Sequence, residues 1–280
     1  MANEAYISGF NFDSMMVPTK AATVFAAQES SLYLSGQIVP MVNVPAGSVS
    51  AQVPLMGTVD ADAITSEAGT GADFEAEFPS DTSVPVNLQL LASRSVVRDF
   101  GGVDTSDVGR ILGNAIGAKV DALVSTELGD LNPQEIPTTG GLLSVDEIYK
   151  AVGAIRGAGE QGQLFGIVSA GAYAELMANI GTQAYAGGDF QTEALRNGFL
   201  GTIAGVQTFV SSALNDTNTG LTDVKMAVFS RDAIRGAIQG GVNLEVARRA
   251  AAVGVDVVAS LGFGCAEVDA TRGRIIIDAA

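Results

Sequence analysis

The chain has 280 residues, with 31 aspartates and glutamates, 15 lysines and arginines, and a formal net charge of -16 at pH 7. This balance argues against direct, sequence-independent binding to nucleic acid and against an anionic membrane surface, because both interactions depend on lysine and arginine. Histidine is absent, which removes the commonest general base and metal ligand, so we expect no catalytic residue, no cofactor and no metal site.

The N-terminal segment, residues 1–45, mixes short apolar pieces with prolines and contains one helix-like stretch, "KAATVFAAQESSLYL", at 20–34. It predicts an arm that includes a helix. It has neither the basic start nor the apolar stretch of a secretion signal, and no window of the chain is long and apolar enough to span a bilayer. We therefore expect a protein that is made and kept in a cytoplasm-like space.

From Val49 the sequence alternates apolar and polar residues to Leu55, and it does so again from Val84 to Leu90. This period of two predicts two strands of a long protruding hairpin. The intervening stretch "MGTVDADAITSEAGTGADFEAEFPSDTS" is acidic, and no lysine or arginine occurs between Lys20 and Arg94. A calcium loop requires a liganding oxygen at its fifth position, which here is Ile64, so a solvated or partner-facing acidic surface is the better interpretation.

Helical periodicity and capping residues mark the next part of the chain. Residues 105–128 place apolar side chains three and four residues apart, which predicts a long helix. A capping box formed by Ser144 and Glu147 opens a second helix, "SVDEIYKAVGAIRG". The stretch "QLFGIVS" predicts a buried strand, and Ser169 caps the helix "AGAYAELMANI" that follows.

The stretch "GFLGTIAGVQTFVSSAL" could be a phosphate-binding loop, a membrane segment, or a turn that leads into a strand. It has the spacing of neither phosphate-loop motif, and it is too short and polar to span a membrane. A turn that leads into a strand after Gly205 is therefore the preferred interpretation.

The remaining chain predicts a strand at "KMAVFS", a helix at "RDAIRGAIQGG", residues 231–241, and antiparallel strands over the last forty residues. The last strands offer Gly262 and Gly264 as bends. The lone cysteine, Cys265, lies in this apolar context and is expected to be a small buried residue.

Taken in order, these pieces resemble the major capsid protein family of tailed bacteriophages, whose shell fold is also used by encapsulins. The most specific pieces are "FGIVSAGAYAELM", "GTIAGVQTFVSSAL" and "VKMAVFSRDAIRGAIQGGVNLEVARRAA". The resemblance implies an α+β fold with four parts: an N-terminal arm at 1–45, an extended β-hairpin loop at 46–98, a peripheral domain at 99–139 and 242–280 with a long spine helix at 105–128, and an axial domain at 140–241.

The resemblance also implies a function. It predicts a structural subunit that self-assembles into hexamers and pentamers and forms an icosahedral shell, the viral capsid of the virion, around double-stranded DNA that it does not bind in a sequence-specific way. It further implies assembly in the host cytoplasm with a separate scaffolding protein, a portal and a decoration protein, and no membrane. The alternatives are an encapsulin-type compartment with enzyme cargo and, with little support, an α/β enzyme.

Some relatives cross-link through a lysine on the extended loop, but residues 46–92 contain no lysine, so we expect non-covalent locking. In "ADFEAEF", one face of a strand would carry the phenylalanines and the other the acids. We expect this segment to dock on a neighbouring copy, with its acids facing arginines. The expected interface residues are Asp73, Phe74, Glu75, Glu77, Phe78, Arg248 and Arg249.

Overall fold

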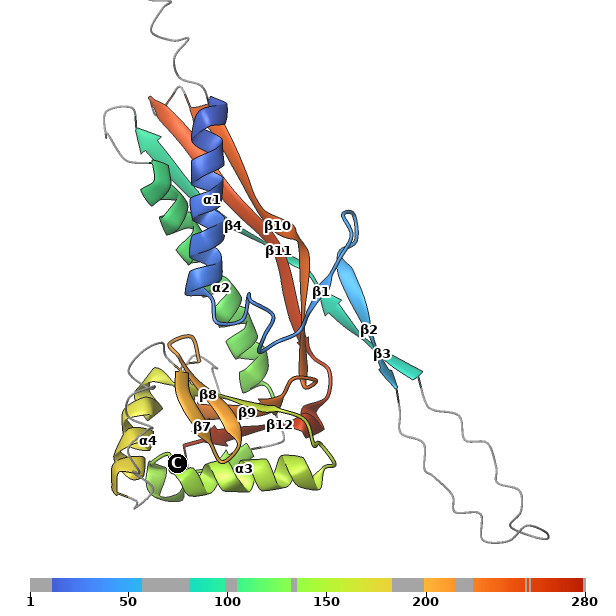
Figure 1. Ribbon diagram of the computed structural model, residues 1–280. Coiled ribbons are helices and arrows are strands. Elements are labelled where there is room, and N and C mark those ends of the chain that lie inside the picture. The colour runs from blue at the N-terminus through green and yellow to red at the C-terminus, as the bar shows by residue number, and fades with distance from the viewer. Residues whose placement is uncertain are drawn as a thin grey trace, which may run out of the picture.

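A computed structural model of the chain describes residues 12–56, 81–98, 105–131, 135–182, 199–214, 224–249, 251 and 253–278. The described chain forms an elongated part, built on a four-stranded sheet, and a compact part, built on a six-stranded sheet, at one end of it (Figure 1).

The elongated part contains a four-stranded sheet in the order β1-β10-β11-β4. Strand β11 lies antiparallel to both β10 and β4, whereas β1 lies parallel to β10. A separate antiparallel pair, β2 with β3, adjoins the beginning of β4 (Figure 1), and it forms the two expected strands of the hairpin. The bounds are β1 (Met41–Asn43), β2 (Ser50–Met56), β3 (Asp81–Asn87), β4 (Gln89–Arg98), β10 (Ile234–Arg249) and β11 (Gly254–Glu267).

Two parallel helices, α1 (Phe12–Ser30) and α2 (Thr105–Gly129), cover one side of this sheet. Helix α2 matches the long helix expected at 105–128, and α1 begins and ends earlier than the expected stretch at 20–34. The two helices approach closely because α2 presents glycines at every fourth position, Gly109, Gly113 and Gly117. A Cβ atom on Gly113 would lie 2.4 Å from the carbonyl oxygen of Thr23, so only glycine allows this contact.

The compact part contains a six-stranded sheet in the order β5-β12-β9-β6-β8-β7, with α3 and α4 packed on it. Both helices begin as the sequence predicts. The capping box of α3 is formed by Ser144 and Glu147, and the Ser169 hydroxyl accepts a hydrogen bond from the Ala172 amide at the start of α4. The bounds are α3 (Val145–Gly157), α4 (Ala170–Thr182), β5 (Glu135–Pro137), β6 (Leu164–Ser169), β7 (Phe199–Ile203), β8 (Val206–Ser211), β9 (Val224–Ser230) and β12 (Gly273–Ile277).

The glycine-rich stretch contains a turn that leads into a strand after Gly205, as expected, and a strand that was not expected, β7, precedes the turn. Strands β7 and β8 are joined by Ala204 and Gly205, which have φ of 53° and 80°. Two consecutive residues with positive φ are typical of the two-residue turns that fit the twist of a β-hairpin. These residues therefore shape the backbone of a hairpin.

The prediction of a helix at residues 231–241 is wrong. From Ile234 onward this segment is the beginning of β10, which pairs with β11. Apolar residues spaced three and four apart suggested a helix, but three glycines weaken that propensity. Tertiary packing decides the outcome, because this segment pairs with β1 on one side, where Met41 lies opposite Gly236, and with β11 on the other. Gly262 and Gly264, expected as bends, lie within β11, and the pairing of β10 with β11 shifts register between Gln239, the partner of Gly262, and Asn243.

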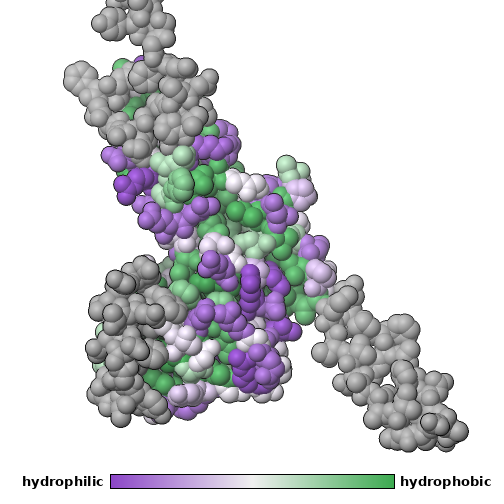
Figure 2. All heavy atoms as spheres, viewed as in Figure 1, coloured by the Kyte–Doolittle hydropathy of each residue, from purple (hydrophilic) through white to green (hydrophobic). Residues whose placement is uncertain are grey.

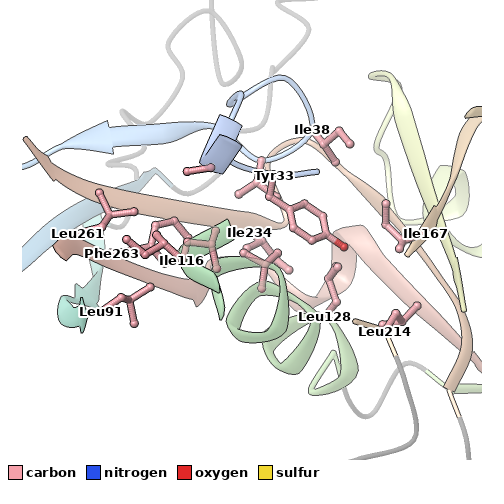
Figure 3. Packing of buried hydrophobic residues seen from close by; sticks show 14 of the residues in the cluster. Tyr33, Ile38, Leu91, Ile116, Leu128, Ile167, Leu214, Ile234, Leu261 and Phe263 are labelled. Atoms are coloured by element: carbon pink, nitrogen blue, oxygen red, sulfur yellow. The ribbon is translucent and has the colours of Figure 1, made fainter. Parts of the chain in front are cut away.

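The largest core joins the two sheets. Tyr33, from the loop after α1, lies fully buried among side chains of α2 and both sheets, with Leu128 and Ile167 nearby (Figure 3). A second core lies between the six-stranded sheet and its two helices, and a third, smaller one holds the β2–β3 pair to β10. The six-stranded sheet thus packs against apolar residues on both of its faces.

Candidate assembly surface and sheet junction

Among the described residues, the β2–β3 pair covers the outer side of the four-stranded sheet, opposite α1 and α2, near Ala237, and the rest of that side is open. Along β11, buried residues such as Val257 and Leu261 alternate with half-buried Asp256, Val258 and Ser260. Strand β4 behaves in the same way and exposes Leu90, at 76%. Because side chains alternate between the two faces of a strand, this pattern describes a sheet with one face packed and one face available to a partner.

Charges on the open face include one close ion pair. The Arg94 guanidinium donates to both carboxylate oxygens of Asp256, with Nε to oxygen distances of 2.7 and 2.9 Å. The hydrogen bond from Arg94 holds the pKa of Asp256 below its usual range, and Arg249 adds to the effect. An ion pair at the surface contributes little to the free energy of unfolding, so the pair of Arg94 and Asp256 matters here as part of the surface that a partner would meet.

The sequence-predicted interface residues fall into two groups. Asp73, Phe74, Glu75, Glu77 and Phe78 lie outside the residues that the structure describes.

Arg248 and Arg249 are the last two residues of β10, and both are exposed. They are paired with Val255 and Gly254, and alternation therefore places them on opposite faces of the sheet. The structure brings them to one end of the hairpin, with Arg249 on the open face.

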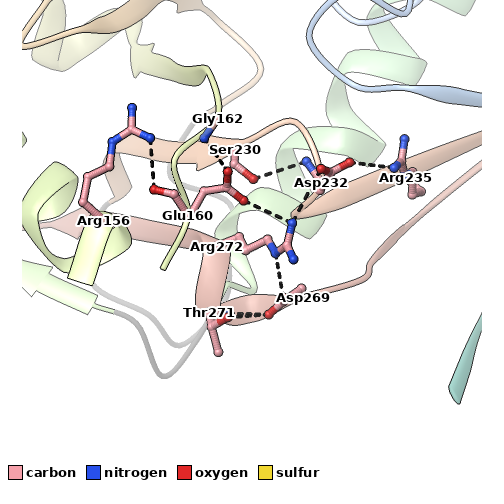
Figure 4. Close-up of polar contacts among 9 residues, drawn as sticks. All are labelled: Arg156, Glu160, Gly162, Ser230, Asp232, Arg235, Asp269, Thr271 and Arg272. Carbon is pink, nitrogen blue, oxygen red and sulfur yellow. Dashed lines mark hydrogen bonds and ion pairs between the residues drawn. The ribbon is translucent and has the colours of Figure 1, made fainter. Parts of the chain in front are cut away.

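A polar cluster holds the connections between the two sheets together (Figure 4). Arg272 lies within 2.9 Å of Asp269, 3.1 Å of Glu160 and 3.5 Å of Asp232. These carboxylates come from the β11–β12 connection, the loop after α3 and the β9–β10 connection. In the view of Figure 2, hydrophilic side chains gather over this region. One guanidinium therefore joins three segments at the junction.

A second cluster lies within the compact part, around Lys225 of β9, whose side chain is 10% exposed. Its ammonium group donates to the Gly141 carbonyl at 2.5 Å and to both Glu175 oxygens at 2.9 Å, and Asp278 lies 3.6 Å away. Although burial raises the pKa of Glu175, hydrogen bonds from Leu143 and Lys225 hold it below its usual range overall. The cluster ties α4 and the end of β12 to the centre of the sheet.

Groups suited to catalysis are scarce in the described part of the chain. Burial raises the pKa of Cys265 to about 12, and the nearby charge of Glu127 adds to this, which leaves the thiol protonated and unreactive at neutral pH. Within the described ranges, no three or more Cys, Asp or Glu side chains are grouped so as to hold a metal ion. None of the described helices has the length and apolar character to cross a membrane.

Sequence reasoning missed Arg272, Lys225 and the α1–α2 glycine contact. Lys225 carried no local signal, because its partners lie far away along the chain, and of the three acids around Arg272 only Asp269 is close to it in sequence. The glycines did carry one: Gly109, Gly113 and Gly117 recur every four residues within a helical pattern, and that spacing places all three on one helix face.

No protein-family model and no curated protein matches the sequence, but solved structures match the fold. The capsid structure of the cyanophage P-SCSP1u has a TM-score of 0.67 and 15% identity over 88% of each chain. A virus-like particle from Pyrococcus furiosus has a TM-score of 0.63 and 12% identity over 92% of this chain and 97% of that one. The mature capsid of bacteriophage PhiM1 has a TM-score of 0.58 and 12% identity over 85% and 84%.

Proposed function

We propose that this chain, which has the fold of tailed-phage capsid proteins, is a major capsid protein: a structural, non-enzymatic subunit that forms an icosahedral shell of hexamers and pentamers around double-stranded DNA. The observation that carries this proposal is the likeness to the cyanophage capsid over 88% of both chains. The open face of the four-stranded sheet supports it, because half-buried and exposed apolar side chains there are available to a neighbouring copy.

The partners in this proposal are further copies of the chain, a separate scaffolding protein, a portal and a decoration protein. The protein would lie in the virion after assembly in the host cytoplasm. Its net charge of -16 supports enclosure of DNA without tight binding, because a strongly basic wall would bind the phosphates.

We retain the four-part division of the chain as a proposal: arm, extended loop, peripheral domain and axial domain. Sheet membership argues for several changes at its boundaries, since β4, at 89–98, belongs to the four-stranded sheet and β5, at 135–137, pairs with β12. Strand β10 belongs to the four-stranded sheet from Ile234 onward, whereas β12 pairs with β9 and therefore belongs with the axial part.

For contacts between copies, we propose that the acidic loop docks on a neighbour, with Phe74 and Phe78 buried and Asp73, Glu75 and Glu77 facing arginines. Charge supports this pairing, because residues 57–80 contain acids and no lysine or arginine, whereas Arg248 and Arg249 are exposed. An exposed pair contributes at most about 1 kcal/mol, but repetition over a shell multiplies the effect.

Charge reversal tests the docking proposal. The double variant Glu75→Arg with Glu77→Arg should assemble poorly and become more sensitive to salt, as measured by sedimentation at several salt concentrations. Adding Arg248→Glu and Arg249→Glu should restore part of the assembly. Normal particles from the first variant would contradict the docking, whereas failed rescue would reject only these two arginines as its partners.

The likeness to a virus-like particle favours a second candidate, a compartment that encloses protein cargo in the manner of encapsulins. Electron microscopy of the purified protein tests both, since each predicts closed shells or aberrant particles and capsomers. Nucleic acid in native particles supports the capsid, and protein cargo supports the compartment. A stable monomer over a wide concentration range, measured by analytical ultracentrifugation, would contradict both.

A further inference from the structure

A cavity of about 420 Å³ lies where α1 ends, between the helices and the six-stranded sheet. Its walls come from three places: the last turn of α1 with the segment that follows it, Asp121 of α2, and the end of β8 with Ser211 and Ser212. A water molecule occupies about 30 Å³ in the liquid, and sites for small ligands range from about 300 to 1,000 Å³. The cavity therefore has room for a small molecule or a side chain.

The walls of the cavity carry negative charge and hydrogen-bonding groups. Two carboxylates line it, those of Glu29, which is exposed, and Asp121, which is 8% exposed. Five serines and two glutamines line it as well, and none of its described lining residues is a lysine or an arginine. The walls thus disfavour an anion and favour a cation that donates hydrogen bonds.

Asp121 is a buried charge whose partners are neutral. Its carboxylate oxygens accept hydrogen bonds from the Ser31 hydroxyl at 2.6 Å and from the Leu32 amide at 3.2 Å. It makes no ion pair with a lysine or arginine in the described part of the chain. Burial raises the pKa of Asp121 above its usual range, although the hydrogen bonds act in the opposite direction. Because a buried charge without a counter-ion is costly, a cation bound beside Asp121 would stabilise the folded chain.

Two further polar groups lie near Asp121. Ser125 is one turn further along α2, and the hydroxyl groups of Ser125 and Tyr33 are buried without a hydrogen-bond partner among the described residues. The charge of Asp121 reaches Tyr33, where it adds to the effect of burial and raises the pKa of the phenol. The surroundings of Asp121 are therefore polar beyond the walls of the cavity.

A metal ion fits these walls less well than an organic cation. Calcium takes about six to eight oxygen ligands and magnesium about six, with carboxylates among them, and the described chain groups no three Cys, Asp or Glu side chains around a metal position. An alkylammonium group offers three hydrogen-bond donors on one nitrogen. Its apolar stem would find Leu32, Ile38 and Phe209 in the same walls.

We propose that this cavity binds an alkylammonium group, with Asp121 as its buried counter-ion and Glu29 as a second carboxylate, and that the bound group joins α1 and α2 to β8. The inference goes beyond the proposed shell function and does not depend on it, because the cavity belongs to a single copy of the chain. Two sources share this chemistry, a free amine and a lysine side chain of a neighbouring copy.

The experiment measures thermal unfolding of the unassembled chain in butylammonium chloride, with sodium chloride at the same ionic strength as the reference. Butylammonium should raise the midpoint by about 2–4 °C at saturation, because it binds only the folded chain. Neither 1-butanol, a neutral molecule of the same chain length, nor magnesium chloride should raise it. Absence of a saturable rise, or an equal rise with 1-butanol or magnesium, would overturn the proposal.

Three variants test the residues that hold the ammonium group. Asp121→Asn should abolish the rise in the midpoint. Glu29→Gln, at an exposed position where folding is not at risk, should weaken butylammonium binding about twofold to fivefold. Glu245→Gln is the matched control, because Glu245 is exposed on β10 and does not line the cavity, and it should bind like the wild type. Wild-type affinity in Glu29→Gln would contradict the site even if Asp121→Asn failed to fold.

Assembled particles distinguish the two sources. If a lysine of a neighbouring copy fills the cavity, isothermal titration calorimetry should detect butylammonium binding to the free chain and none to the particles. If the ligand is a free amine, both forms should bind it with similar affinity. Binding to neither form would overturn the proposal and leave the shell function untouched.

Discussion

The two sheets of this protein are buried in different ways. In the six-stranded sheet, every residue of β6 is buried, because one face packs on α3 and α4 and the other on the core shared with α2. In the four-stranded sheet, β11 alternates between buried and half-buried residues, because helices cover only one face. The first sheet completes its core within the chain, and the second leaves a face for a partner.

This difference separates stability from assembly. Substitutions in the six-stranded sheet should affect folding of the free chain, since its partners are already present. Substitutions on the open face of the four-stranded sheet should matter mainly in the assembled protein. Side chains of the same type in the two sheets allow a direct test.

The largest effect is expected from Lys225→Met, which leaves Glu175 and Asp278 without their shared cation inside the compact part. Removing one member of a largely buried ion pair should lower the free energy of unfolding by about 3 kcal/mol, measured by urea denaturation. The low pKa of Glu175 means that this stabilisation is present above its ordinary value of 4.5 and is lost as pH falls below it.

Lys150→Met is the control for that measurement, because Lys150 is 58% exposed and its amine lies 3.9 Å from Glu147. It should change stability by less than about 0.5 kcal/mol. Equal losses from the two variants would contradict the special role of the buried lysine.

A matched valine pair tests the comparison itself. Val228 in β9 is fully buried and Val258 in β11 is half-buried on the open face. Val228→Ala should cost the free chain about 2–3 kcal/mol through lost burial and a cavity. Val258→Ala should cost the free chain well under about 1 kcal/mol and raise the critical concentration for assembly. If the two variants lose similar free energies of unfolding as free chains, Val258 is packed within the chain, and this result would contradict an open outer face.

A glycine pair tests the helical layers that cover each sheet. Gly113→Ala should destabilise the chain by about 1–3 kcal/mol, because the added Cβ would lie 2.4 Å from the Thr23 carbonyl and displace α1. Gly153→Ala in α3 should stabilise it by about 0.5–1 kcal/mol, because nothing lies within 4 Å of that position and alanine favours a helix. Thermal unfolding should therefore shift in opposite directions, and shifts of the same sign would contradict the close packing of α1 on α2.

The smallest effect concerns Glu127, near the end of α2. Burial raises its pKa, and the charges of Asp130 and Glu267 add to this. A raised carboxylate pKa means stability that is present below the ordinary value of 4.5 and lost as pH rises through the folded value. Glu127→Gln should therefore stabilise the chain by about 0.5 kcal/mol at pH 7 and have no effect at pH 4.

Glu245→Gln, at an exposed position of β10, is the control for Glu127→Gln. It should change the free energy of unfolding at pH 7 by less than about 0.5 kcal/mol, because an exposed charge contributes little to stability. A constant difference between the Glu127 variant and the wild type from pH 4 to pH 7 would contradict the raised pKa.

Elements that depend on neighbouring residues could be predicted from the sequence. The capping box of α3 joins residues three apart, and the hydroxyl that caps α4 belongs to the residue just before that helix. The alternation that predicted β2 and β3 is likewise a local pattern, and the order of such elements was enough to suggest the fold. The acidic segment and its arginines remain a prediction, because 57–80 lies outside the described residues.

The sequence by itself determined the capped helices, the alternating strands and the acidic, histidine-free composition, since each depends on residues close together in the chain. Only the tertiary structure decided that residues 231–241 form a strand beside Met41, that Arg272 meets Glu160 across more than a hundred residues, and that Val253 has positive φ. Propensity is a weak preference of about 1 kcal/mol or less per residue, and close packing against distant segments overrides it.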